Sequence, residues 1–327
     1  MVDIFENLGM IDVDENDIVQ ISEELMGILL KDHTSGKNII WASDYYMKHG
    51  DKYKPTCQIT VDSITGRKNK VIKPRTCKSK SDQLKRSRDV AEVFTPSWVC
   101  NNQINLIDRA WFGYDNAFNY GSENTKWKTN YNPILFNDKK WTDYVSDVRL
   151  EITCGEAPYL VSRYDTVSDD FIEVIDRIGI LDRKIRVVNE NCTDDNWYDW
   201  VKIAFQSVYG YDLQGDNVIL SRENLLLSFI DYYKDRFKND PPNDMMLEIA
   251  NIISWNIWQM DGMKYVIPYS CESKKVIQVN LFGEKIESEK ICVGCEKNEP
   301  KKHNGLYCKI KDWKLNKTVK YVDMVKK

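Results

Sequence analysis

Residues 150–160 of this 327-residue chain read Leu-Glu-Ile-Thr-Cys-Gly-Glu-Ala-Pro-Tyr-Leu, and this stretch decides the expected fold. The segment from Val148 to Ile152 predicts a short β-strand that runs directly into a turn. Small residues in that turn, Cys154 and Gly155, let the backbone approach a bound ligand closely. Because turns after parallel strands gather at the carboxyl edge of a sheet, where ligands bind, the stretch predicts an α/β protein with a ligand site at that edge.

The chain that follows this stretch alternates between helix and strand. Apolar residues between Trp197 and Val208 recur at helical spacing and predict a helix that is capped at its start by Asp194 or Asp195. A strand is expected over 208–211, and further helices are expected over 216–237 and 243–255. Alternation of this kind favours a mostly parallel sheet that is covered by helices on both faces.

The flanking parts of the chain have different patterns. Apolar residues at helical spacing predict one amphipathic helix over 15–31, and short β-rich runs occur at 39–41 and 58–61. We therefore expect three parts. These are a small mixed α/β region over 1–85 that ends in a basic linker, an α/β domain over 86–270, and a basic Cys/His-containing region over 271–327.

Three further motifs accompany the stretch at 150–160. They are Ala-Glu-Val-Phe-Thr-Pro-Ser-Trp-Val at 91–99, Val-Tyr-Gly-Tyr-Asp at 208–212 with Ser-Arg-Glu-Asn-Leu at 221–225, and Ile-Ile-Ser-Trp-Asn-Ile-Trp-Gln-Met-Asp-Gly at 252–262. In content and order the four motifs resemble those of S-adenosylmethionine-dependent DNA adenine (amino) methyltransferases of restriction–modification systems. In this chain Glu151, Ile152 and Ala157 stand where that family usually has Asp, Pro and Gly. The resemblance covers about residues 85–265 and implies a Rossmann-like methyltransferase sheet.

The resemblance also implies which residues hold S-adenosylmethionine. They are Phe94, Thr95, Pro96, Glu151, Cys154, Gly155, Asp212 and Asp261. Phe94 would pack on the cofactor beside the Thr95 hydroxyl, Asp212 would accept both ribose hydroxyls, and Asp261 would meet the adenine end. The same residues have simpler explanations: a Pro-initiated helix start at Pro96, an acidic turn residue at Asp212, and core packing at a helix end near Asp261.

The activity that the resemblance implies is methyl transfer to the amino group of adenine in DNA. Family members carry a [D/N/S]-P-P-[Y/F/W] motif, whose aromatic residue stacks on the flipped-out base. In this chain Asp-Pro-Pro-Asn at 240–243 comes too early and lacks the aromatic residue, and Val-Ile-Pro-Tyr at 266–269 lacks the acceptor. The catalytic residue is therefore unknown. Either the motif is degenerate and the chain is an incomplete regulatory subunit, or a second polypeptide supplies it.

The cysteines divide into scattered single residues and one cluster. Of the nine cysteines, Cys292, Cys295 and Cys308 lie with His303 at spacings that suit tetrahedral zinc, which predicts a zinc-ribbon-like appendage. Cys271 is an alternative ligand, and a basic hairpin with reduced surface thiols is the competing explanation. With only three histidines in the chain, the sequence argues against a multi-His metal centre or a His-based catalytic dyad.

The charge distribution favours a nucleic-acid partner in spite of a net charge of −4. Residues 67–88 contain ten Lys or Arg against one acid, Asp82, and residues 297–327 contain ten Lys. Such segregation creates positive faces that suit DNA, although two solvated surface segments would look the same. A zinc-dependent nucleic-acid-binding module without a cofactor is therefore the rival hypothesis. Without an apolar run of membrane length or a signal peptide, we expect a cytoplasmic protein with no membrane partner.

Overall fold

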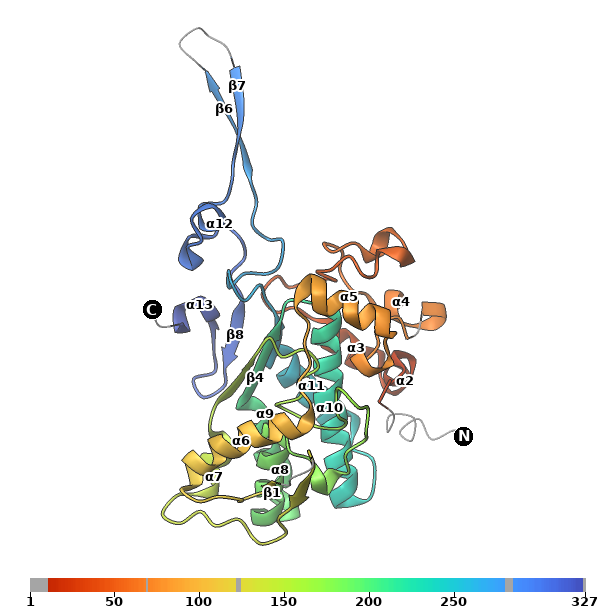
Figure 1. The fold of residues 1–327 in the computed structure, drawn as a ribbon, viewed down its shortest axis with the longest axis vertical. Helices are drawn as coiled ribbons and strands as arrows, with labels where there is room; N and C mark the ends of the chain where they lie inside the picture. Colours follow the sequence, from red (N-terminus) through yellow and green to blue (C-terminus); the bar gives the residue numbers. More distant parts are fainter. Residues whose placement is uncertain (1–10, 69, 122–124, 280–284, 326–327) are drawn as a thin grey trace.

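The computed structural model describes residues 11–68, 70–121, 125–279 and 285–325. It is a mixed α/β structure, mostly helical, with a small three-stranded parallel sheet and a Cys/His cluster near the C-terminus. Among the described helices, none combines the length and the apolar character that a membrane crossing requires. Figure 1 shows the sheet and its long helices at the centre, the N-terminal region beside them, and the β6–β7 hairpin projecting away.

The N-terminal region consists of short helices. They are α2 (Glu15–Ile21), α3 (Glu23–Leu30), α4 (Val61–Ile64) and α5 (Lys80–Val90), with 3-10 turns at Met47–His49, Asp51–Tyr53, Gly66–Lys68 and Arg75–Cys77. The single helix predicted over 15–31 is wrong, because Ser22 is extended (φ −164°) and its hydroxyl caps α3 by accepting from Leu25 N. The strands predicted at 39–41 and 58–61 are also wrong, since these runs form only an isolated bridge between Ile40 and Gln58.

The central region contains the parallel sheet and its covering helices. In chain order it consists of α6 (Ser97–Phe112), β1 (Asn119–Gly121), β2 (Trp127–Thr129), α7 (Trp141–Ser146), β3 (Arg149–Ile152), a 3-10 turn at Val174–Asp176, α8 (Ile180–Asn191), α9 (Asp194–Gln206), β4 (Val208–Asp212), α10 (Gly215–Phe237), α11 (Asn243–Asn256) and β5 (Ile257–Gln259). The order in the sheet is β3-β4-β5, with Glu151 level with Gly210 and Gly210 level with Ile257. The strands and helices predicted from residue 148 to 255 are thus confirmed to within about two residues. The predicted cap of α9 is wrong, because Thr193 is the N-cap and Asp194 and Asp195 lie in the first turn of the helix.

The C-terminal region follows β5 and contains two antiparallel hairpins. Its elements are β6 (Lys274–Val279), β7 (Lys285–Lys290), α12 (Val293–Lys297), a 3-10 turn at Pro300–Lys302, β8 (Lys309–Asp312), β9 (Lys317–Lys320) and α13 (Tyr321–Met324). The backbone of β8 and α13 lies against the sheet (Figure 1).

The two faces of the sheet are covered in different ways. Helix α10 packs on one face together with α11, and most of its residues are buried, as expected for a helix inside a core. The other face presents Tyr209, Tyr211 and Trp258 to Ile310 of β8 and Tyr321 of α13. The expectation of helices on both faces is thus confirmed for the α10 face only, because the aromatic face is covered mainly by the β8–β9 hairpin, with the four-residue helix α13 beside it.

Arg222 of α10 joins the N-terminal region to the sheet. Its guanidinium is fully buried and donates to Leu29 O and Lys31 O, and also to Ser254 O and Ile257 O. The apolar core is likewise continuous across this junction, with α3 packed on α11. A domain boundary at 85/86 remains a prediction, but it does not separate two cores.

Replacing Arg222 tests this junction. We expect Arg222→Met to lower the free energy of unfolding by on the order of 3 kcal/mol, because four carbonyls, three of them at buried contacts, lose a charged donor. The measurement is urea denaturation, in which an unchanged m-value shows that the variant alters stability alone. The control is Arg109→Met, whose exposed ion pair with Asp115 should contribute less than about 1 kcal/mol. Equal losses in the two variants would show that the Arg222 contacts do not hold the regions together.

Candidate functional site

The turn after β3 lies at the carboxyl edge of the sheet and brings three predicted residues together. Gly155 adopts φ 55°, and its N–H donates to Asp212 Oδ2 at 3.0 Å. A Cβ on Gly155 would lie 3.2 Å from the Phe94 ring, so only glycine lets this ring approach without displacement. Ala157, which stands where the related motif has Gly, keeps a left-handed backbone with φ 62°. Phe94, Gly155 and Asp212 therefore converge at one point.

Asp212 ends β4 and is held by the start of α10. Its Oδ1 accepts from Gln214 N at 2.9 Å and from Asn217 Nδ2 at 3.4 Å. Burial raises the pKa of Asp212 to about 6, and the N–H donors from Gln214 and Gly155 offset part of that effect. Since Oδ2 receives a single hydrogen bond here, the carboxylate retains capacity to accept another donor.

Glu151 lies beneath the same turn with half of its carboxyl group unpartnered. Its Oε1 accepts from Tyr159 N at 3.4 Å, whereas Oε2 is buried and has no hydrogen-bond partner among the described residues. Burial raises the pKa of Glu151 well above its ordinary value. A buried carboxyl oxygen without a donor is uncommon in folded proteins, so Glu151 is a candidate for accepting a ligand's donor group.

The segment from Phe94 to Pro96 serves both as a contact and as a helix start. Phe94 is buried, and the Arg75 guanidinium lies 5.4 Å from its ring centre. The Thr95 carbonyl accepts from Thr166 Oγ1, and Pro96 immediately precedes α6, whose first N–H is capped by Asp165 Oδ2. Pro96 can thus start helix α6 while Phe94 packs against the turn after β3, so the two explanations for this segment do not exclude each other.

Two other predicted residues have local partners. The Asp261 carboxylate accepts from Met263 N and Lys264 N and pairs with Lys264 Nζ at 3.0 Å, so these bonds close its own turn. The Cys154 thiol is buried 3.6 Å from Ser221 Oγ, and burial raises its pKa well above the ordinary value. Cys154 thus packs under the turn.

Sequence reasoning missed the residues that anchor this turn from α10. The Ser221 hydroxyl donates to Gly155 O, and Asn224 Nδ2 donates to Glu156 O at 3.0 Å. Glu156 in turn accepts from Arg75 N at 2.6 Å. Ser221 and Asn224 are one helical turn apart within the motif at 221–225, and that spacing was the available signal.

A buried ionic network connects the turn to the basic segment. Arg86 Nε donates to both oxygens of Glu92, and a terminal nitrogen of the guanidinium lies 2.7 Å from Asp216 Oδ2. Gln214 Nε2 bonds Glu92 Oε2, while Gln214 N bonds Asp212. Burial alone would raise the pKa of Asp216, but Arg86 and neighbouring donors lower it below its ordinary value.

The Cys/His cluster is the second candidate site. The ligand atoms of Cys271, Cys292, Cys295 and His303 all lie within 4.8 Å of one another. The three sulfur atoms are 3.6, 3.7 and 3.6 Å from His303 Nδ1. Tetrahedral zinc, with Zn–S about 2.3 Å and Zn–N about 2.0 Å, places sulfur and nitrogen about 3.5 Å apart. The four residues therefore fit a tetrahedral metal ion.

Neighbouring groups fix the ligands of this cluster. Asn304 N donates to Cys292 Sγ at 3.2 Å, and Tyr307 OH accepts from His303 N at 2.9 Å. Burial opposes ionisation of Cys292, but the backbone N–H donors, led by Asn304, lower its pKa to about 6. A Cβ on Gly294 would lie 2.6 Å from His303 N, so glycine is required at this close approach.

The structure corrects one predicted ligand. Cys308 is fully buried at the start of the β8–β9 hairpin, where its thiol donates to Gln259 O at 3.4 Å. Cys271 completes the cluster in its place. Spacing favoured Cys308, but the β6–β7 hairpin returns the chain from Cys271 to Cys292.

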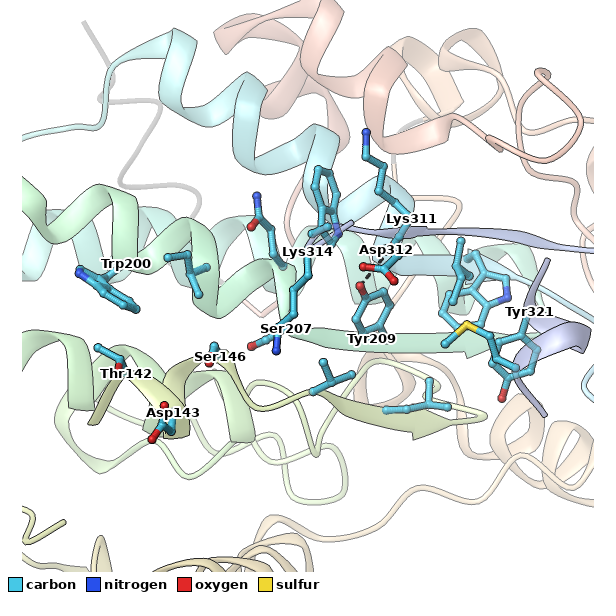
Figure 2. A pocket seen from close by; sticks show the side chains of 18 residues that line it. Thr142, Asp143, Ser146, Trp200, Ser207, Tyr209, Lys311, Asp312, Lys314 and Tyr321 are labelled. Atoms are coloured by element: carbon cyan, nitrogen blue, oxygen red, sulfur yellow. Dashed lines mark hydrogen bonds between the residues drawn. The ribbon is translucent and has the colours of Figure 1, made fainter. Parts of the chain in front are cut away.

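A cavity of about 600 Å³ lies on the sheet face opposite α10 (Figure 2). Tyr209 and Tyr321 line it from the sheet and α13, and Trp200 closes the far end. Val148 and Leu150, at its β3 side, are 54% and 41% exposed. In the described part of the chain no strand pairs with the outer edge of β3. This edge therefore combines bare backbone with apolar side chains.

Comparisons with known proteins identify no relative. No family model, no curated protein and no solved structure matches this chain. The function must therefore be argued from the two sites.

The composition of the metal cluster can be tested directly. We expect purified protein to bind one zinc ion per chain, and Cys271→Ser to reduce that stoichiometry to near zero because one tetrahedral ligand is lost. Metal content by mass spectrometry and the charge-transfer absorption of the Co²⁺-substituted protein are the measurements. The matched control is Cys308→Ser, which should retain the metal. Loss of zinc in the control with retention in Cys271→Ser would restore the ligand set predicted from spacing.

Proposed function

We propose that this chain binds S-adenosylmethionine at the carboxyl edge of its sheet. We further propose that it is the cofactor-binding part of a DNA adenine-N6 methyltransferase of a restriction–modification system. The observation that carries the proposal is the convergence of Phe94, Gly155 and Asp212 at the ends of β3 and β4. The parallel strand order, with a long helix beginning directly after Asp212, supports a methyltransferase-type sheet.

The residues at this edge fit the cofactor by their donors and acceptors. The Asp212 carboxylate would accept the ribose hydroxyls, and the Phe94 ring would pack against the ligand. The unpartnered Glu151 Oε2 would accept a hydrogen bond from the ammonium group on the methionine part of the cofactor. The positive charge of that group would favour the ionised carboxylate, which burial disfavours. When bound, the cofactor supplies an electrophilic methyl group on its sulfonium.

The adenine-binding half of the enzyme is proposed to come from a second polypeptide. After β5 the chain enters the C-terminal region, and the described sheet ends at three strands. Tyr269, in the segment closest to the expected aromatic motif, is 62% exposed and is preceded by Pro268 without an acceptor before it. The unpaired edge of β3 beside the cavity of Figure 2 is where an added strand would pair.

A second candidate function is a zinc-dependent nucleic-acid-binding module without a cofactor. It is favoured by the Cys/His cluster and by the lysines that surround it in the sequence. An incomplete regulatory subunit that binds cofactor without transferring methyl groups is a variant of the first proposal. Cofactor binding separates the two classes, because the zinc module needs no S-adenosylmethionine.

Titration calorimetry with S-adenosylmethionine and with its demethylated product tests the proposal. We expect binding of both, weakened about 10- to 100-fold by Asp212→Asn, as expected for hydrogen bonds to a charged acceptor. The control is Asp199→Asn, an exposed carboxylate on α9 that should leave affinity unchanged. Absence of binding by the unmodified chain would refute the methyltransferase proposal. Methylation of plasmid DNA only after a partner protein is added would support the two-polypeptide form.

A further inference from the structure

A strongly basic cavity lies between the segment 45–49 and the basic segment at 67–86. Its volume is about 790 Å³. Six lysine or arginine side chains besides Arg86 line it: Lys48, Arg67, Lys70, Lys73, Lys78 and Lys85. Asp82 is the single acidic residue among the lining residues, and its carboxylate already accepts from the Ser79 hydroxyl. The cavity therefore has a large excess of positive charge in a protein whose net charge is −4.

Only part of this charge is neutralised within the chain. Arg86 is paired with Glu92 and Asp216. The Lys78 side chain is 8% exposed and its ammonium lies 3.5 Å from Asp216, but it has no hydrogen-bond partner among the described residues. The Lys78 ammonium is thus ion-paired with Asp216 but makes no hydrogen bond, so its N–H groups retain the capacity to donate to a ligand.

Three exposed basic residues, Lys48, Arg67 and Lys85, are the outer cations of the cavity, and none of them is paired with a carboxylate among the described residues. The Lys85 ammonium lies over the Tyr45 ring, 5.2 Å from its centre. These side chains come from three separate segments, so the positive surface is wider than one phosphate group. Successive phosphates of a strand match such a surface better than a single small anion does.

We infer that this cavity binds backbone phosphates of DNA. The choice of DNA among phosphate polymers rests on the proposed function. The position of the cavity supports it, because the Arg86–Glu92 pair reaches Asp212 through Gln214, and Arg75 contacts both Phe94 and Glu156. DNA held by the cavity thus lies beside the carboxyl edge of the sheet. Lys78 and the outer cations contact phosphate oxygens and carry no sequence information.

The test is fluorescence anisotropy of a labelled DNA duplex with the full-length chain across a series of salt concentrations. The variant Lys48→Glu/Arg67→Glu/Lys85→Glu changes three exposed side chains, so the fold is retained. The control Lys297→Glu/Lys301→Glu/Lys317→Glu makes the same change in net charge at exposed positions of the C-terminal region. We expect the cavity variant to bind at least tenfold more weakly at about 0.1 M salt. The slope of log K against log salt should become shallower by about 2 to 3, whereas the control should lose much less.

Each other outcome overturns the inference. Equal loss in the two variants would mean that affinity follows net charge, and greater loss in the control would place DNA on the C-terminal region. Pyrophosphate or a nucleoside triphosphate that binds in a cavity-dependent way, without cavity-dependent DNA binding, would assign the site to a small ligand. Calorimetry of the cavity variant with S-adenosylmethionine keeps the proposals separate. If the protein binds S-adenosylmethionine but the cavity variant binds DNA as well as the unmodified chain does, only this inference is refuted. If the cavity variant loses DNA affinity but the protein does not bind S-adenosylmethionine, only the methyltransferase proposal is refuted.

Discussion

The hydrogen bond from the Gly155 N–H to the Asp212 carboxylate is the constraint on which the carboxyl edge of the sheet depends. It joins the turn after β3 to the end of β4, and the absence of a side chain on Gly155 lets Phe94 approach the same point. Asp212 is itself fixed by Gln214 N at the start of α10. The helix that positions this carboxylate also carries Arg222, so the N-terminal region and the edge of the sheet are held by one element.

This arrangement leaves two acids in unfavourable surroundings. Burial raises the pKa of Asp212 to about 6 and that of Glu151 still more clearly, and no described lysine or arginine pairs with either carboxylate. In contrast, two nearby acids are paired. Asp216 lies four residues after Asp212, Glu92 contacts Gln214 beside Asp212, and both acids form ion pairs with Arg86. This contrast supports the proposal that a ligand contributes donors at the carboxyl edge of the sheet.

Elements fixed by the periodicity of their own side chains could be predicted from the sequence, whereas features fixed by tertiary contacts could not. The strand at 208–211 and helices over 194–206, 216–237 and 243–255 were predicted well because buried periodic side chains determine them. The helix break at Ser22 was not predicted, because a hydroxyl cap interrupts an otherwise periodic run of apolar residues. The segment at 39–41 has strand-forming residues but packs as an extended coil against the sheet edge, where the Gln259 side chain is hydrogen-bonded to the Ile40 backbone. Cys271 could not be chosen over Cys308 from spacing, since the choice depends on a hairpin and on which thiol faces the sheet.

A path of hydrogen bonds connects the metal cluster to the carboxyl edge of the sheet. His303 N donates to Tyr307 OH, and Tyr307 bridges to Val266 while Cys308 N donates to Tyr265 O. Tyr265 N donates to Asp261 O, and Met260 N donates to Asp212 O. These hydrogen bonds, together with the covalent links Tyr307–Cys308 and Met260–Asp261, form a continuous path from His303 to Asp212. The C-terminal region is therefore hydrogen-bonded to the chain next to the sheet edge and also covers the aromatic face of the sheet.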